Sequence, residues 1–193
     1  RTLAQYDIGF ISMDMRGFGR CRFDDEQKFS TKTDNKAKIN HEKSYQDIVA
    51  LTKLVNAKYP NLPIIAMGES LGCTFCVRLA AENKQLVDGI ALNAPAVKVN
   101  AKMYASPSEL AQVAKGLLLT KTGTVSLNTF ITKLVSTRQE VIDEMMEDPL
   151  ILKKIQITDL LSTDIFVDKT IKYGKQTDPR LAVLIMQGSA DGC

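Results

Sequence analysis

Gly68-Glu69-Ser70-Leu71-Gly72 is the most informative stretch of this 193-residue chain. It follows a short apolar run at residues 62–67 (LPIIAM) and precedes a helix-like stretch at residues 73–81. A strand, the pattern G-x-S-x-G and a helix together predict a very tight turn, in which the serine takes strained backbone geometry and projects its hydroxyl from a sheet. A side chain at Gly68 or Gly72 is expected to collide where strand and helix pass each other. The backbone N–H of Leu71 is expected to point at an oxyanion beside Ser70.

The bulk composition is that of an ordinary globular protein, with 45% hydrophobic and 24% charged residues. The length suits one core, or one core with a modest insertion. A net charge of +3 is too small to indicate nucleic-acid binding, and a single Phe, Phe29, with no Tyr or Trp, lies among the lysines of residues 28–43. We expect that lysine-rich stretch, with His41 in it, to be a solvated loop. No apolar run approaches the ~20 residues of a membrane span, and the oligomeric state is open.

The four cysteines include the pair Cys73 and Cys76, which matches C-x-x-C. We interpret this pair as packing rather than redox chemistry, because Gly72, Cys76 and Ala80 form a stripe of small residues on one helix face. No further cysteine or histidine at zinc spacing accompanies them, so no metal is expected. The absence of a disulfide-like framework favours the cytoplasm.

Strand and helix patterns alternate along the first 95 residues. Residues 6–13 (YDIGFISM) are predicted to form a buried strand, and a helix is predicted from Ser44, with Asp47 as a weaker variant of a capping box. The strand before Ser70 and a further strand at residues 87–92 follow. This alternation indicates a parallel sheet covered by helices on both faces, which is an α/β fold.

Residues 96–176 show helical patterns only, which is far longer than an ordinary connection between strands. Capping boxes are predicted at Ser106 and Thr137, and Gly174 is predicted to be a C-cap glycine. The region is interpreted as an inserted helical cap or lid. The core is expected to comprise residues 1–95 and to resume at 177–193 with a strand at residues 181–186, which a turn ending in Asp191 follows.

The order of these motifs resembles the α/β-hydrolase fold, and most closely its branch of monoacylglycerol lipases, lysophospholipases and related serine hydrolases. The motif D-x-R-G-x-G is matched by Asp14, Arg16, Gly17 and Gly19, and G-x-S-x-G by residues 68–72. The resemblance covers essentially the whole chain, although the cap is matched only by its position and helical character. It implies that Ser70 is a nucleophile, that the Leu71 N–H is one oxyanion donor and that Asp191 is the acid of a Ser-Asp-His triad.

The resemblance further implies a serine hydrolase that cleaves carboxylic esters of acyl chains, with a small-molecule or lipid substrate and no metal or organic cofactor. Amide and thioester hydrolysis use the same serine turn (the nucleophile elbow of this fold) and the same triad, and they stay open as alternatives. A ligand-binding member of the fold that has lost catalysis is the alternative from another class.

The triad histidine is expected outside this chain. The only histidine, His41, precedes Ser70, whereas the fold's order is Ser, then Asp, then His. The resemblance also places the second oxyanion donor, and the strands on both sides of residues 6–13, before the first residue. We therefore expect an internal fragment of a longer hydrolase, with at most trace activity by itself.

Overall fold

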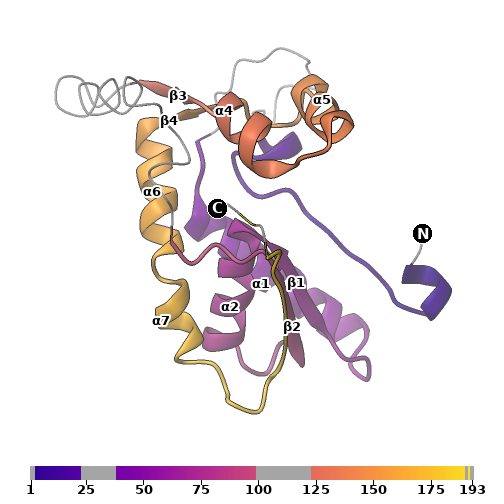
Figure 1. Cartoon of the computed structure of the whole chain (residues 1–193). Helices are drawn as coiled ribbons and strands as arrows, with labels where there is room; N and C mark the ends of the chain where they lie inside the picture. Colours follow the sequence, from indigo (N-terminus) through magenta and orange to yellow (C-terminus); the bar gives the residue numbers. More distant parts are fainter. Residues whose placement is uncertain (1–2, 23–37, 99–122, 190, 192–193) are drawn as a thin grey trace.

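A parallel sheet of three strands carries the serine turn. Its strands are β1 (Ile65–Glu69), β2 (Gly89–Asn93) and β5 (Ala182–Met186), in the order β1-β2-β5. Figure 1 shows the computed structural model, which describes residues 3–22, 38–98, 123–189 and 191. The register aligns Glu69 with Asn93 and Asn93 with Met186, so the three carboxyl ends lie in one row. The predicted α/β class is confirmed, as are strands close to three of the four predicted positions.

Helices flank this sheet, and a second group of elements lies beyond its carboxyl edge (Figure 1). The helices are α1 (His41–Lys58), α2 (Leu71–Glu82), α4 (Asn128–Phe130), α5 (Gln139–Glu147), α6 (Ile157–Val167) and α7 (Thr170–Gly174). Strands β3 (Thr124–Ser126) and β4 (Lys154–Gln156) form an antiparallel pair. Short 3-10 turns at Leu3–Tyr6 and Gly19–Arg22 and a π-helical turn at Ile131–Val135 complete the described elements.

The main core lies around α2. This helix follows the serine turn directly, and eight of its twelve residues are buried. It packs against β1 and β2 on one side and against α7 on the other. Phe166 of α6 and Tyr173 of α7 belong to the same buried cluster as Phe75 and Leu79 of α2. The end of the predicted cap therefore packs into the main core, while the division at residues 95 and 176 stays a prediction.

Helix α1 begins three residues before the predicted start. Asn40 is its N-cap, and the Asn40 side chain accepts a hydrogen bond from the backbone N–H of Lys43 at 2.9 Å. The predicted capping box at Ser44 is wrong, because Ser44 lies inside the helix and its hydroxyl accepts a hydrogen bond from the Arg16 N–H. The asparagine supplies the cap because its amide oxygen reaches the free N–H groups of the first turn.

The D-x-R-G-x-G turn is fastened to α1. Arg16 forms a bidentate ion pair with Asp47, with N–O distances of 2.6 and 3.0 Å. The Asp14 carboxylate accepts a hydrogen bond from the Arg20 N–H at 2.9 Å. Gly19 has φ +51°, and a Cβ there would lie 2.5 Å from the Asp14 carboxylate, so the turn requires glycine at this position.

The predicted buried strand at residues 6–13 is not found. Residues 8–13 have no regular secondary structure, and Ile8, Phe10 and Ile11 are exposed. Figure 1 shows this segment as an extended trace that runs apart from the sheet. A strand needs a neighbouring backbone to satisfy its N–H and C=O groups, and the described chain provides none beside these residues.

The region beyond the carboxyl edge of the sheet is not purely helical, which corrects the prediction for residues 96–176. The β3–β4 pair packs Val125 and Ile155 into a second cluster with Ile39, Leu152 and Ile157. The capping box predicted at Thr137 is also wrong, because α5 begins at Gln139 with Arg138 as N-cap and no side-chain capping bond.

Two further capping predictions have different outcomes. Gly174 is the last residue of α7, and the C-cap is Lys175 in ordinary helical geometry, so the predicted glycine cap is wrong. The capping box at Ser106 lies outside the described residues.

Across the described ranges, none of the helices combines the length and apolar character that crossing a membrane requires.

Candidate active site

Ser70 occupies a strained position between β1 and α2. Its backbone angles are φ 48° and ψ −117°, and a positive φ is costly for a residue with a Cβ. The side chain is exposed and makes no capping hydrogen bond to α2, so its hydroxyl is not used to hold the helix. The predicted strand, tight turn and helix with an exposed serine are confirmed.

The two glycines of the motif have different environments. A Cβ on Gly68 would lie 2.5 Å from the backbone C and O of Gly72 and 2.7 Å from the N of Cys73. A Cβ on Gly72 would meet no atom within 4 Å. The collision expected at both positions is therefore correct for Gly68 and wrong for Gly72. Of these two glycines, only Gly68 is required by the close approach of strand and helix.

Leu71 is the first residue of α2. N–H groups in the first turn of a helix have no partner within the helix, and the helix dipole places partial positive charge there. A negative oxygen beside Ser70 would therefore be stabilised by the Leu71 N–H and by the start of a helix of 12 residues. The role of Leu71 as an oxyanion donor stays a prediction.

Asp191 lies in an exposed turn after β5, at the same carboxyl edge of the sheet as Ser70. Its carboxylate accepts a hydrogen bond from Gln187 Nε2 at 2.6 Å, and its N–H donates to the Gly188 carbonyl at 3.2 Å. Because β2 separates β1 from β5, the ends of these two strands are roughly 10 Å apart. The role of Asp191 as the acid stays a prediction.

His41 is not the solvated loop residue that was expected. It is the first residue of α1, it is only 5% exposed, and its ring stacks on Phe166 with 4.8 Å between centroids. Its Nε2 is 2.9 Å from Thr163 Oγ1, and its buried Nδ1 has no hydrogen-bond partner. Burial lowers the pKa of His41 to about 4. Neither ring nitrogen is bonded to Ser70.

The C-x-x-C pair lies in the interior, directly behind the serine turn. Cys73 and Cys76 are both buried, and burial raises their pKa values to about 11 and about 12. Both thiols are therefore protonated at neutral pH, which opposes thiolate chemistry and supports the packing interpretation. The Cys73 thiol also donates to the carbonyls of Gly68 and Asn93, at 3.2 and 3.4 Å. No cluster that could hold a metal occurs within the described ranges.

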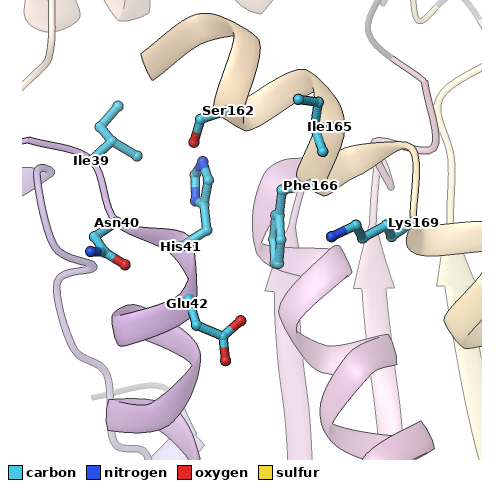
Figure 2. A pocket seen from close by; sticks show the side chains of 8 residues that line it. All are labelled: Ile39, Asn40, His41, Glu42, Ser162, Ile165, Phe166 and Lys169. Carbon is cyan, nitrogen blue, oxygen red and sulfur yellow. The ribbon is translucent and has the colours of Figure 1, made fainter. Parts of the chain in front are cut away.

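A groove of about 320 Å³ lies between the start of α1 and helix α6. Figure 2 shows the His41 ring standing beside Phe166, with Ser162 of α6 facing it. The groove is lined by Ile39, Asn40, His41, Glu42, Ser162, Ile165, Phe166 and Lys169. None of the three predicted site residues lines it, so this groove is separate from the surface around Ser70.

Sequence analysis did not identify the contact between the serine turn and the end of the neighbouring strand β2. Asn93 ends β2, and its carbonyl accepts a hydrogen bond from the Ser70 N–H at 2.9 Å. Ala94, with φ 44°, is a second non-glycine residue at positive φ beside Ser70. Nothing in the sequence around Ala94 and Pro95 indicates this positive φ.

Relatives support the resemblance to lipases over part of their length. The chain is 28% identical to monoglyceride lipase of Mus musculus over 152 residues, which are 76% of this chain and 47% of the mouse protein. The enzyme of Rattus norvegicus matches with the same identity and coverage. This chain thus spans about half the length of the curated relatives it matches.

Solved structures match the fold at low sequence identity. A soluble variant of monoglyceride lipase from Saccharomyces cerevisiae aligns with a TM-score of 0.67 and 17% identity, over 92% of this chain and 58% of that chain. The monoacylglycerol lipase of Paleococcus ferrophilus aligns with a TM-score of 0.57 and 21% identity, over 77% of this chain and 54% of that chain. At such identities the likeness concerns the fold alone.

The family assignment rests on a match along the whole chain. The model of the family described as serine aminopeptidase, S33, matches residues 1–193. The parallel sheet, the strained serine turn and the flanking helices agree with that match. The chain belongs to the serine aminopeptidase S33 family of hydrolases and has the α/β-hydrolase fold.

Proposed function

We propose that the protein containing this chain is a serine hydrolase that cleaves carboxylic esters of acyl chains. Ser70 is the nucleophile, the Leu71 N–H is one oxyanion donor and Asp191 orients the catalytic base. The observation that carries the proposal is the conformation of Ser70 directly before α2. Its backbone has φ 48°, its side chain is exposed, and its hydroxyl makes no capping hydrogen bond to the helix. Strain of this kind persists where the surrounding structure enforces it, and it is concentrated at active sites.

The base in this proposal is a histidine beyond residues 1–193. His41 is the only histidine of the chain, and its Nε2 is engaged by Thr163. In the first step, the imidazole takes the Ser70 proton while Oγ bonds to the ester carbonyl carbon, and the carbonyl oxygen becomes an oxyanion. The oxyanion then reforms the carbonyl, the ester bond breaks and the leaving alcohol takes the proton from the imidazolium. Water then gives a proton to the same imidazole while its oxygen bonds to the acyl carbon. The acyl–Oγ bond breaks, the acid leaves and Ser70 Oγ takes the proton from the imidazolium.

The ester preference rests on the relatives. Both mammalian relatives are named as monoglyceride lipases, whereas the family description names a peptidase. Amide hydrolysis is therefore the second candidate, and it requires the same serine and base. To distinguish the two candidates, the full-length protein is given an ester and an amide that carry the same acyl group, and the two rates of hydrolysis are compared.

A fluorophosphonate probe on the full-length protein tests the proposal. We expect labelling of the wild type and none of Ser70→Ala. Asp191→Asn should slow both labelling and ester turnover by roughly 10³-fold or more, because a triad without its carboxylate loses the correct imidazole tautomer. Absence of labelling in the wild type would favour a ligand-binding protein that has lost catalysis. Labelling that survives in Ser70→Ala would place the nucleophile elsewhere.

A further inference from the structure

Both backbone polar groups of Ser70 are held by hydrogen bonds. Its N–H donates to the Asn93 carbonyl at 2.9 Å. Its carbonyl accepts from the Cys73 N–H at 3.0 Å and from the Ala96 N–H at 3.3 Å. The end of β2 and the residues after it therefore hold Ser70 from both sides of its α-carbon. Ala96 supplies a hydrogen bond to the Ser70 carbonyl from outside α2.

The segment that supplies these contacts is itself strained. Ala94 has φ 44°, and its N–H donates to the Met186 carbonyl at the end of β5 at 2.8 Å. An alanine at positive φ persists only where its surroundings enforce that conformation. Some other contact must therefore hold the residues after Ala94 in place.

Thr170, the first residue of α7, makes such a contact. Its Oγ1 lies 2.7 Å from Thr74 Oγ1 on α2, 2.6 Å from the Val167 carbonyl and 3.3 Å from the Ala96 carbonyl. Thr74 is fully buried and Thr170 is 5% exposed. The Thr170 hydroxyl has one proton, which the two carbonyls share in a three-centre bond. Thr74 must then be the donor in the bond between the two hydroxyls.

We propose that Thr170 is a positioning residue for Ser70 and acts through Ala96. The Thr170 hydroxyl fixes the Ala96 carbonyl, and the N–H of the same residue fixes the Ser70 carbonyl. Ala96 is thereby held at both of its peptide planes. This path connects α7, which ends the helical region after β2, with the backbone of the strained serine. The inference rests on the proposed role of Ser70 as a nucleophile.

Three single substitutions in the full-length protein separate positioning from packing. Thr170→Val keeps the shape of the side chain and removes the hydroxyl, so the rate of Ser70 labelling by a fluorophosphonate should fall about tenfold. Thr170→Ser keeps the hydroxyl and should label within about twofold of the wild type. Thr74→Val is the matched control. It removes the hydrogen bond between the two hydroxyls but keeps the hydrogen bonds from the Thr170 hydroxyl to the carbonyls of Ala96 and Val167. It should also label within about twofold.

Hydrogen exchange at the Ala96 amide gives a second measurement that does not depend on activity. Thr170→Val should speed this exchange roughly tenfold, and Thr74→Val should leave it nearly unchanged. If Thr170→Val does not fold, the double variant Thr74→Val/Thr170→Val replaces it, because no buried hydroxyl then lacks a partner. We expect the double variant to label as slowly as predicted for Thr170→Val.

The outcomes for the two proposals are distinct. Equal effects of Thr170→Val and Thr74→Val on both measurements, or no effect of Thr170→Val on either, would overturn the positioning role. A wild type that is never labelled, with Ala96 exchange still sensitive to Thr170→Val alone, would overturn the hydrolase proposal. The link from Thr170 to the Ser70 backbone would then remain supported.

Discussion

Nε2 of His41 lies 2.9 Å from Oγ1 of Thr163, which joins the first residue of α1 to the middle of α6. The Thr163 hydroxyl donates its proton to the Asp159 carbonyl at 2.8 Å. It must therefore accept from His41, which assigns the imidazole proton to Nε2. Nδ1 then carries no proton, and it is buried without a hydrogen-bond partner. A second proton on this ring would be buried without an acceptor, which agrees with the lowered pKa of His41.

This arrangement predicts a stability that falls as the pH falls. The pKa of His41 is about 4 in the folded chain, whereas an unfolded histidine has a pKa of about 6.5. Between these values the unfolded state binds the proton and the folded state does not. The free energy of unfolding should therefore decrease by up to about 1.4 kcal/mol per pH unit from pH 6.5 down to 4, and this contribution is fully present above pH 6.5.

Urea denaturation of wild type and His41→Phe across this pH range measures that contribution. Phenylalanine keeps an aromatic ring against Phe166 and has no proton to bind. Carboxylates titrate in both proteins, so the difference between the two curves isolates His41. Parallel curves would show that the histidine has an ordinary pKa in the folded chain.

A second prediction contrasts the two glycines of the serine turn. Gly68→Ala should destabilise the chain by about 2 kcal/mol, because its Cβ would lie 2.5 Å from the Gly72 backbone. Gly72→Ala should be neutral or stabilising by up to about 1 kcal/mol, because its Cβ meets open space and alanine favours a helix. Thermal denaturation of both variants checks this order. If both variants lost the same stability, the serine turn would need glycine at both positions.

The features predicted correctly from the sequence are local ones. The serine turn is encoded in five consecutive residues, and β2 and β5 are short apolar runs bounded by turn residues. Their signals do not depend on a distant partner. Gly68 belongs to the same local pattern, since the contact that requires it is with Gly72 and Cys73.

The features that sequence reasoning missed depend on distant partners. Residues 8–13 have the apolar pattern of a strand, but a strand forms only beside another backbone. The burial of His41 comes from Phe166 on α6, which nothing near residue 41 indicates. The contact from Thr170 to Ala96 likewise joins residues far apart in the chain. Sequence periodicity describes one element at a time and does not report such pairs.

A third prediction concerns Arg78, which joins three helices. Its guanidinium is 2.7 Å from Glu42 of α1 and 3.1 Å from Glu82 of α2, and its Cζ lies 3.8 Å from the centroid of the Tyr45 ring and 5.6 Å from that of the α7 residue Tyr173. Arg78→Met should lower the free energy of unfolding by about 1–3 kcal/mol, through lost ion pairs and lost stacking. Chemical denaturation measures the loss.

Arg138→Met is the matched control for Arg78→Met. Arg138 pairs with Glu140 at 3.0 Å, but both side chains are largely exposed. Its removal should change the free energy of unfolding by no more than about 0.5 kcal/mol. If the two variants lose the same free energy, the contacts of Arg78 with the three helices contribute no more than a surface ion pair.

The last prediction concerns the 193-residue polypeptide by itself. It should hydrolyse a nitrophenyl acyl ester at a trace rate at most, because its only histidine is held between Phe166 and Thr163 and neither of its ring nitrogens is bonded to Ser70. Without a base, the Ser70 hydroxyl stays a weak nucleophile. The test compares the wild type with Ser70→Ala and His41→Phe under the same conditions. Hydrolysis that is fast and lost in both variants would identify His41 as the base, and the proposal of a histidine beyond these residues would then be wrong.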